Sequence, residues 1–202
     1  MRMQRFGLLL ICAALSAYAQ VPYQRIAGAD NNPGAWVTYS GNYQAQRYSQ
    51  LDQINRQNVT QLKPTWVYQM RNPGIVETSP IVADGIMYIT EPPSTATALD
   101  LHTGRPLWTY TPNIPQDVII IGSPPVNRGV AILDNTVFFG TVNCHLIALD
   151  AKSGIVRWDI VVDDNKKGYY VTGAPLAIDG KIIVGVSGAE TGIRGFLDAY
   201  DA

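Results

Sequence analysis

The sequence repeats itself at an interval of fifty residues, and this period restricts the fold more than any other feature. Each copy opens with an Ala-x-Asp step, continues with a Thr-Gly or Ser-Gly pair and reaches a tryptophan ten residues after its first alanine. Two copies start at Ala98 and Ala148, and a third start, Ala199, follows fifty-one residues after the second. Such a period is typical of solenoids and propellers, in which one supersecondary unit is repeated.

Strand-like runs fill the rest of each period. Short β-branched or aromatic runs flank an Asp-Gly or Asp-Asn pair at Asp84-Gly85, Asp134-Asn135 and Asp179-Gly180. These pairs favour tight β-hairpins because they tolerate positive φ. With the Asp-x-x-Thr/Ser-Gly step as a further turn, one period supplies about four strands, the size of a propeller blade. The sequence therefore predicts an all-β fold with Trp108 and Trp158 at equivalent, largely buried positions.

The first nineteen residues have the pattern of a secretory signal peptide. Residues 1–5 contain two arginines and no acidic residue, residues 6–15 are apolar, and Ala17-Tyr18-Ala19 matches a small-residue cleavage site. The apolar run is about half the ~20 residues that a bilayer core requires. We therefore expect a signal peptide at 1–19, an exported domain at 20–202, no membrane span and a periplasmic location.

The net charge restricts the classes of binding partner, and the cysteine content restricts the possible disulfides. Removing the two arginines of the leader changes the formal net charge from −1 to −3. A mildly acidic surface gives no electrostatic basis for binding nucleic acid or an anionic membrane. Cys144 would be the one cysteine left, which excludes an internal disulfide and predicts a buried, inert thiol. His102 and His145 have no metal-ligand spacing and are interpreted as structural residues.

Glutamate is scarce, with three residues against thirteen aspartates. Glu77 precedes a predicted hairpin, Glu91 begins a Glu-Pro-Pro step, and Glu190 follows an apolar strand. The ordinary interpretation is that all three are solvated carboxylates at strand ends, because glutamate is mostly exposed. Glycines around Glu190 would let the backbone approach a ligand, and a carboxylate there could bind a hard cation such as Ca²⁺. One carboxylate does not make a calcium site, so both interpretations stay open.

Several motifs resemble one family, the pyrroloquinoline-quinone (PQQ) dependent alcohol dehydrogenases. The tryptophan repeats resemble the docking motif of quinoprotein propellers, and the segment from Trp36 to Trp66 resembles the opening of this family in order and spacing. Four further motifs stand in the family's order: Val76-Glu77-Thr78-Ser79-Pro80, Val126-Asn127-Arg128-Gly129, Thr172-Gly173-Ala174-Pro175 and Ser187-Gly188-Ala189-Glu190. The resemblance runs from about residue 33 to the end. It implies a partial β-propeller of about three to four four-stranded blades, out of a quinoprotein propeller of about eight.

Position by position, the resemblance implies a cofactor site for PQQ. Its contacts would be Glu77, Arg128, Thr172, Ser187, Gly188, Ala189 and Glu190, and Glu190 would also bind the metal, Ca²⁺ or a lanthanide. The set is chemically coherent because PQQ is a flat tricarboxylate and Arg128 offers a planar fork for carboxylate or quinone oxygens. The metal would act as a Lewis acid on the quinone carbonyl. The catalytic aspartate of the family would lie beyond residue 202.

The chain departs from the family at one place. Many members have two adjacent cysteines that form a ring over the cofactor, and the matching positions are Gly122 and Ser123. No such ring can form in this chain. This difference puts the efficiency of turnover in question more than cofactor binding.

The resemblance implies a periplasmic quinoprotein dehydrogenase that oxidises a small alcohol to an aldehyde and passes electrons to a c-type cytochrome or a haem domain. The alternative is a non-catalytic exported propeller that scaffolds the cell envelope. A scaffold has no reason to keep Glu77, Arg128, Thr172 and the 187–190 motif together. A plain calcium module would need an Asp-rich loop, which is missing. For the enzyme, Glu77, Arg128, Thr172 and Glu190 should converge at one end of the blades.

Overall fold

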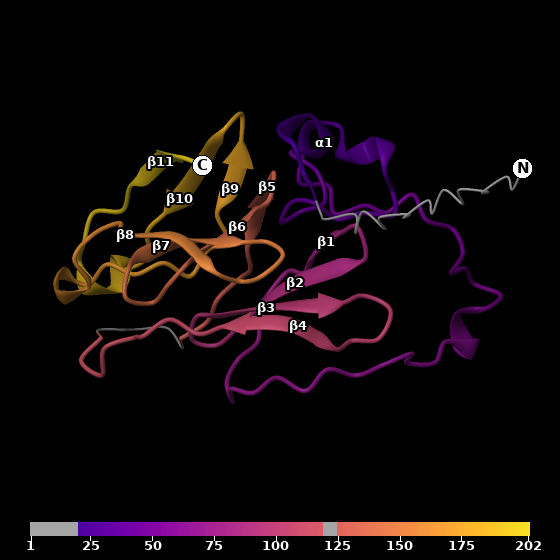
Figure 1. The fold of residues 1–202 in the computed structure, drawn as a ribbon, viewed down its shortest axis with the longest axis horizontal. Coiled ribbons are helices and arrows are strands. Elements are labelled where there is room, and N and C mark those ends of the chain that lie inside the picture. Colours follow the sequence, from indigo (N-terminus) through magenta and orange to yellow (C-terminus); the bar gives the residue numbers. More distant parts are fainter. Residues whose placement is uncertain (1–19, 119–124) are drawn as a thin grey trace, which may run out of the picture.

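Three antiparallel sheets stand side by side in the computed structural model, which describes residues 20–118 and 125–202 (Figure 1). Two sheets have four strands each, in the order β1-β2-β3-β4 and β5-β6-β7-β8, and the third has the order β11-β10-β9. This confirms the all-β partial propeller. Four strands per blade hold for the first two sheets, while the third has three strands within the described residues.

Each sheet is one blade. Blade 1 contains β1 (Ile81–Ala83), β2 (Ile86–Glu91), β3 (Thr95–Asp100) and β4 (Pro106–Tyr110). Blade 2 contains β5 (Ala131–Leu133), β6 (Thr136–Gly140), β7 (His145–Asp150) and β8 (Val156–Val161). Blade 3 contains β9 (Leu176–Ile178), β10 (Lys181–Gly185) and β11 (Leu197–Asp201). The helices are short: α1 (Tyr23–Ala27), η1 (Ala29–Asn31), η2 (Val59–Gln61), η3 (Asn165–Lys167) and η4 (Ala189–Thr191).

The first hairpin of every blade turns at the predicted Asp pair. Asp84, Asp134 and Asp179 have φ of 50°, 49° and 45°, so all three occupy the left-handed region. Strand pairing resumes two residues later, at Ala83↔Ile86, Leu133↔Thr136 and Ile178↔Lys181. Asp is one of the few residues that tolerate this conformation, which explains why the short turn recurs.

The fifty-residue repeat is also a structural repeat. Trp108 pairs with Ala98 and Trp158 pairs with Ala148, and each pair is followed by the same shift of register. Both tryptophans are mostly covered and pack against the core, which agrees with the predicted equivalent, largely buried positions. The Trp108 indole lies over the β7–β8 turn of blade 2 and donates from Nε1 to the Ala151 carbonyl at 2.9 Å. Docking on a surface turn covers one part of the indole and leaves the rest exposed.

Blade 2 contributes most of the core because it has a blade on either side. Every residue of β5 and β6 is buried. Phe138 is fully buried, with its ring centroid 5.6 Å from that of Trp158, and Phe139 lies 6.1 Å from Tyr110 of blade 1. The Phe139–Tyr110 contact therefore joins blades 1 and 2, whereas the Phe138–Trp158 contact lies within blade 2, between β6 and β8.

Residues 20–43 bind the hairpin end of all three blades. Arg25 forms an ion pair with Asp84 of blade 1 at 2.8 Å, and Val21 forms a β-bridge with Asp134 of blade 2. The Tyr43 hydroxyl donates to the Ala177 carbonyl of blade 3 at 2.6 Å, and burial raises the pKa of Tyr43 to about 12. This segment cross-links the ends of the inner hairpins.

Some predictions fall outside the described residues or concern absences. The signal peptide at 1–19 and the Gly122-Ser123 pair lie outside them. In the part of the chain that the structure describes, no helix has the length and apolar character that a bilayer crossing needs. Cys144 is fully buried, and burial raises the pKa of its thiol to about 11, in agreement with an unreactive side chain.

Replacing Gly154 by alanine should destabilise the docking between blades. Gly154 has φ of 70°, and a Cβ on it would lie 2.7 Å from the Trp108 ring, so the substitution adds a steric clash to the backbone strain. Gly180 is a matched control because its φ is 74° and a Cβ would meet nothing within 4 Å. We expect Gly180→Ala to lower the free energy of unfolding by about 1 kcal/mol and Gly154→Ala by about 1–3 kcal/mol more, measured by urea denaturation. Equal losses would contradict the docking role.

Asp150 should make stability depend on pH in the acid range. Partial burial raises its pKa, but hydrogen bonds from Arg157 and Ser153 lower it more, so the pKa falls from 3.8 to about 2. The ionised form therefore stabilises the fold fully above pH 4, and this contribution is lost as the pH falls from about 4 to 2. In urea titrations, the stability difference between the wild type and Asp150→Asn should shrink over that range. A constant difference from pH 6 to pH 2 would refute the assignment.

Candidate functional site

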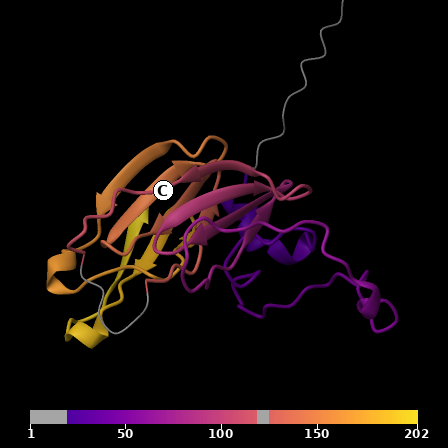
Figure 2. The same cartoon turned by 90° about the horizontal axis from the view of Figure 1, so that it is seen from below.

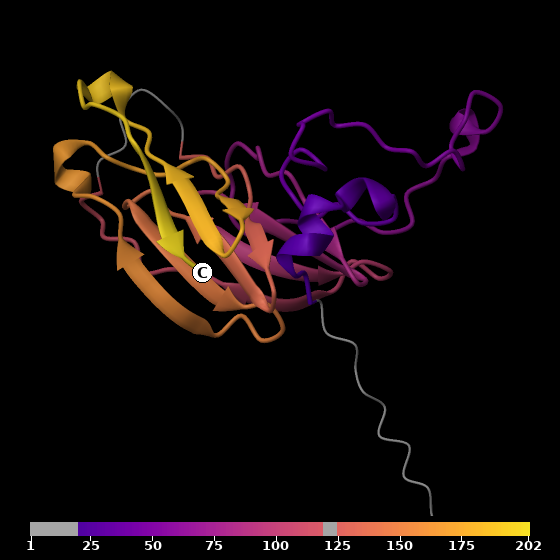
Figure 3. The same ribbon diagram turned by 90° about the horizontal axis from the view of Figure 1, so that it is seen from above.

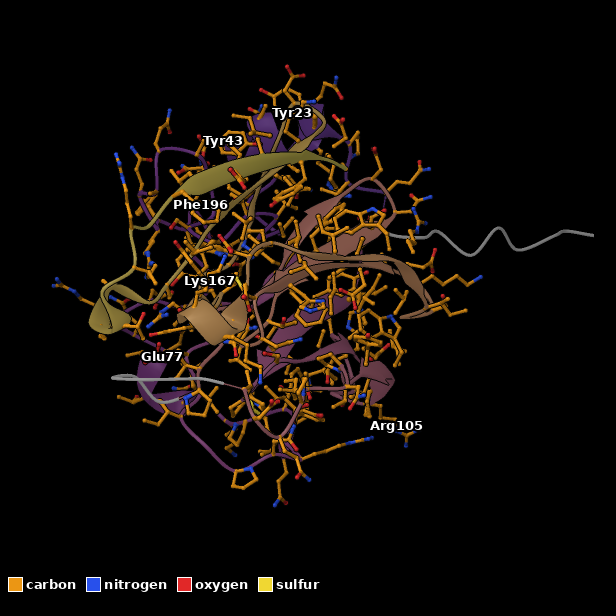
Figure 4. All side chains as sticks on the ribbon, turned by 90° about the vertical axis from the view of Figure 1, so that its left-hand side faces the viewer. Tyr23, Tyr43, Glu77, Arg105, Lys167 and Phe196 are labelled. Carbon is orange, nitrogen blue, oxygen red and sulfur yellow. The ribbon has the colours of Figure 1, made fainter. Side chains whose placement is uncertain are left out.

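The predicted site residues gather at one end of the blades. Glu77, Asn127 and Thr172 each stand seven residues before the hairpin aspartate of their blade. They therefore come shortly before the first, inner strand of each blade, which is β1, β5 or β9. Inner strands of successive blades run in the same direction, so these positions lie at the end opposite the hairpin turns. Figure 4 shows Glu77 on one side of the molecule and Arg105, from the β3–β4 turn, on the other.

Backbone hydrogen bonds link the three segments directly. The Ser79 amide donates to the Arg128 carbonyl at 3.0 Å, and the Arg128 amide donates to the Thr172 carbonyl at 2.9 Å. Gly129 has φ of 128°, and a Cβ there would lie 2.9 Å from the Ser79 carbonyl oxygen, so glycine allows this close approach. The segment that carries Arg128 is thus held between the starts of blades 1 and 3.

Four predicted side chains form one continuous polar chain. Arg128 Nη2 lies 2.8 Å from Glu77 Oε2, and Arg128 Nη1 donates to Thr172 Oγ1 at 2.8 Å. Thr172 Oγ1 in turn lies 2.9 Å from Ser187 Oγ. Residues separated by up to 110 positions in sequence therefore meet, as predicted for Glu77, Arg128 and Thr172.

These hydrogen bonds hold the Arg128 side chain in one position without burying it. Thr172 is 4% exposed, whereas the side chains of Arg128 and Glu77 are 38% and 37% exposed. Contacts through two different nitrogens restrict the rotation of the guanidinium, which has five N–H donors in all. The result is an oriented, permanently charged fork at a partly open surface, suited to planar anions.

A tight turn places residues 188–190 beside these four side chains. Ser187 forms an antiparallel bridge with Tyr170, with its amide 2.7 Å from the Tyr170 carbonyl oxygen. Gly188 follows with φ of 130°, and a Cβ on it would lie 2.2 Å from the Gly168 carbonyl oxygen, so no larger residue fits. Ala189 and Glu190 then begin η4 and are exposed.

Glu190 joins the site through Tyr170 and not through Arg128. The Tyr170 hydroxyl donates to Glu190 Oε2 at 3.2 Å. Burial raises the pKa of Tyr170, and the charge and hydrogen bond of Glu190 raise it further, so this tyrosine stays a donor at neutral pH. Tyr170 is itself 1% exposed, so an exposed carboxylate is hydrogen-bonded by a buried residue.

The described residues fit a planar anion better than they fit a complete metal site. An arginine and two hydroxyls are the donors that a flat tricarboxylate needs, and Gly173 leaves space in which a Cβ would meet nothing within 4 Å. Within residues 20–118 and 125–202, no three His, Cys, Asp or Glu side chains are close enough to hold an ion. Calcium takes six to eight oxygen ligands, and a single carboxylate such as that of Glu190 could supply only one or two of them.

The structure adds residues that the sequence interpretation missed. Asn127 is 2% exposed and holds the segment before Arg128, because its Nδ2 donates to the Gly140 carbonyl at 2.8 Å and its Oδ1 accepts from the Gly129 amide at 3.1 Å. Its blade position, shared with Glu77 and Thr172, was a signal that could have identified it. Tyr170 had no comparable signal.

Glu91 was interpreted as a solvated carboxylate, and this was wrong. It is fully buried and accepts hydrogen bonds from the Tyr68 hydroxyl at 2.9 Å, the Arg71 amide at 2.7 Å and the Thr97 hydroxyl at 2.9 Å. Three donors from neighbouring elements replace water around the carboxylate, which makes its burial tolerable. Glu91 therefore fastens the loop at residues 68–71 to blade 1.

Comparisons with known proteins agree with this fold. Residues 36–202 match the family described as PQQ glucose/ethanol/alcohol dehydrogenase, beta-propeller domain. The chain is 41% identical over 209 residues to the dehydrogenase subunit of the quinone alcohol dehydrogenase of Gluconacetobacter polyoxogenes, covering 95% of this chain and 28% of the relative. It is 43% identical over 188 residues to quinohemoprotein alcohol dehydrogenase ADH-IIG of Pseudomonas putida, covering 91% and 26%.

Solved structures show the same relationship. The ADHIIG structure from Pseudomonas putida HK5 superposes with a TM-score of 0.84 at 40% identity, covering 92% of this chain and 28% of that one. A europium-containing methanol dehydrogenase also has a TM-score of 0.84, at 36% identity, with 88% and 32% covered. The chain thus spans little more than a quarter of the length of the curated relatives it matches.

Proposed function

Because this chain belongs to the PQQ glucose/ethanol/alcohol dehydrogenase β-propeller family, we propose that it forms the N-terminal part of a quinoprotein propeller that oxidises alcohols to aldehydes. The Glu77–Arg128–Thr172–Ser187 chain carries this proposal, since it joins three blades at one end and presents an oriented cation there. A non-catalytic envelope scaffold would not require these four side chains to be in contact.

Each of these residues would make a different contribution to binding the cofactor. Arg128 binds a carboxylate or quinone oxygen of PQQ, Glu77 and Thr172 hold the guanidinium in place, and the Ser187 hydroxyl contributes a neutral donor. PQQ supplies the ortho-quinone that accepts hydride from the alcohol. The turn at Gly188 and Ala189 lets the backbone approach the ring, since the backbone there is compact and Ala189 is small and exposed.

Glu190 would bind the metal ion, Ca²⁺ or a lanthanide, together with PQQ and with oxygen ligands from other parts of the protein. Its carboxylate is exposed and already oriented by Tyr170. Ser187, which precedes Glu190's turn, is linked through Thr172 to Arg128. The metal and the guanidinium would then act on the same anionic ligand.

The names of relatives support the proposed electron acceptor, and the signal-peptide pattern of residues 1–19 supports the proposed compartment. One relative, 41% identical over 174 residues and covered to 25% of its length, is the 1-butanol dehydrogenase (cytochrome c) of Thauera butanivorans. Others are quinohemoproteins of Pseudomonas putida. We therefore propose a small alcohol as the substrate, a c-type cytochrome or a haem domain as the acceptor, and the periplasm, reached through the leader at 1–19, as the location.

Reconstitution of the complete apoprotein tests this function. PQQ and Ca²⁺ are added, binding is followed by absorbance, and oxidation of ethanol and 1-butanol is followed with an artificial dye as the acceptor. Stoichiometric PQQ binding with alcohol-dependent dye reduction is the expected result. Failure to bind PQQ would overturn the proposal, and PQQ binding without oxidation of any alcohol would overturn the assigned reaction.

A further inference from the structure

The second strand of blade 1, β2, ends in two buried polar residues, Thr90 and Glu91. Thr90 is 1% exposed and Glu91 is fully buried. The hairpins of the three blades share one register, which makes Gly140 of blade 2 and Gly185 of blade 3 the equivalents of Thr90. Among these three blades, a hydroxyl at this position is therefore specific to blade 1, and the shared β-hairpin does not require it.

Thr90 connects the segment of Glu77 to the segment of Arg128. Its backbone amide donates to Thr78 Oγ1 at 2.9 Å, and its hydroxyl oxygen lies 3.0 Å from that same atom. The hydroxyl also donates to the Asn127 carbonyl at 3.2 Å, directly before Arg128. Because Thr78 directly follows Glu77, the Thr90 hydroxyl contacts a chain neighbour of each partner in the ion pair.

The stretch before Glu77 reaches blade 1 from outside the blades. The chain around η2, purple in Figures 2 and 3, stands away from the blades and returns at Trp66, whose Nε1 donates to the Leu101 carbonyl at 2.9 Å. Glu91 fastens the chain again, because its carboxylate accepts from the Arg71 amide at 2.7 Å. The residues from there to Glu77 form no helix or strand, so their position depends on contacts with blade 1.

The middle of the same stretch packs on the turn that follows β2. Gly74 has φ of 152°, and a Cβ on it would lie 2.9 Å from the Pro92 ring. Only glycine allows so close an approach in this conformation. Together with Glu91 before it and Thr90 after it, this contact ties the backbone around Glu77 to the end of β2.

The Glu77–Arg128 ion pair is too exposed to fix its own geometry. Its side chains are 37% and 38% exposed, and water and salt screen ion pairs at such places. A buried, hydrogen-bonded hydroxyl keeps its geometry better, because leaving its partners unpaired is costly. An anionic ligand that needs the guanidinium in one position binds with an affinity proportional to the fraction of molecules that already hold it there.

We propose that Thr90 is a positioning residue for the cofactor site, whose hydroxyl keeps the segments of Glu77 and Arg128 at the spacing that orients the guanidinium. Glu91 is the second anchor, because it fixes the start of the stretch that leads to Glu77. This role rests on the proposed binding of PQQ at Arg128. Thr90 itself does not touch the ligand, since its side chain is buried.

Replacing Thr90 by valine removes the hydroxyl and keeps the size of the side chain and the amide hydrogen bond to Thr78. In the complete apoprotein, titration with PQQ should show an affinity about three- to tenfold lower than in the wild type, as for the loss of a neutral hydrogen bond. Thr90→Ser restores the hydroxyl and should bring the affinity back to within about twofold of the wild type. Wild-type affinity in Thr90→Val, or a serine variant as weak as the valine variant, would overturn the proposal.

Combining Thr90→Val with Arg128→Ala shows whether the hydroxyl acts through the guanidinium. PQQ should bind the double variant as weakly as it binds Arg128→Ala, because the group that Thr90 positions is already missing. Additive losses in a protein whose wild type binds PQQ would overturn the positioning role alone. A wild type that does not bind PQQ would overturn the proposed function together with this role.

Thr136→Val is the matched control, and hydrogen exchange without PQQ is an independent measurement. Thr136 is 7% exposed and its Oγ1 accepts from Arg157 at the hairpin end of blade 2, so its replacement should leave PQQ affinity unchanged. In the apoprotein, the Ser79 amide, which donates to the Arg128 carbonyl at 3.0 Å, should exchange about three- to tenfold faster in Thr90→Val than in Thr136→Val. Equal exchange in the two variants, or an equal loss of PQQ affinity, would overturn the proposal.

Discussion

Replacing Arg128 by alanine in the complete protein is expected to weaken PQQ binding about ten- to a hundredfold or more. A hydrogen bond to a charged group contributes roughly 1.5–3 kcal/mol, and a tenfold change in affinity corresponds to about 1.4 kcal/mol. The substitution also leaves the Glu77 carboxylate without its 2.8 Å partner beside a polyanionic ligand. Binding is measured by titrating the apoprotein with PQQ, and added calcium should not repair the defect.

Arg157 offers a closely matched control. Its Nη2 lies 2.8 Å from a carboxylate, Asp150, and its Nη1 donates to a hydroxyl, Thr136, at 2.7 Å, while its side chain is 40% exposed. Arg128 has the same two kinds of partner and 38% exposure. Arg157→Ala should therefore leave PQQ affinity unchanged. A loss of affinity in both variants would point to instability, and normal PQQ affinity in Arg128→Ala would show that the cofactor contact is misassigned.

Replacing Glu190 by glutamine is expected to lower the affinity for the metal and to reduce alcohol oxidation at limiting Ca²⁺. The substitution keeps the size of the side chain and its capacity to accept the Tyr170 hydroxyl bond, but it removes the negative charge that a hard cation prefers. Activity should be partly restored by excess Ca²⁺. The reconstituted enzyme is assayed for dye reduction across a series of calcium concentrations, and the half-saturating concentration should rise about tenfold or more, as for the loss of a charged ligand.

Asp179→Asn provides the control for a lost carboxylate. Asp179 is exposed at the hairpin turn of blade 3, at the end opposite Glu190, and asparagine tolerates its φ of 45°. Its calcium dependence should match the wild type. If Glu190→Gln also has the wild-type calcium dependence, Glu190 is not a metal ligand. Because Arg128→Ala resists calcium and Glu190→Gln responds to it, the two roles can be separated.

Local features of the fold were predictable because they depend on short-range chemistry. The three Asp turns follow from the tolerance of aspartate, glycine and asparagine for tight turns. The equivalence of Trp108 and Trp158 follows from the period alone. The contacts of each indole with its neighbours do not follow from the period, because they depend on how one sheet packs against the next.

The candidate site could be predicted only in part from the sequence. Glu77, Arg128 and Thr172 were identified through motifs, and their positions near the inner strands explain why they converge. The same reasoning misread Glu91, since nothing nearby in sequence reveals that Tyr68, Arg71 and Thr97 surround it. It also missed Tyr170, whose hydroxyl orients Glu190 from within the protein.

The sequence by itself determined the repeating unit, the hairpin turns and the end of the blades at which polar side chains collect. These properties arise within about fifty residues, where turn conformation and strand alternation decide the structure. Only the tertiary structure decided that Arg128 joins Glu77 to Thr172, that Glu190 connects through Tyr170, and that Trp66 docks on blade 1. These contacts join different blades, and their distances depend on how one sheet packs against the next.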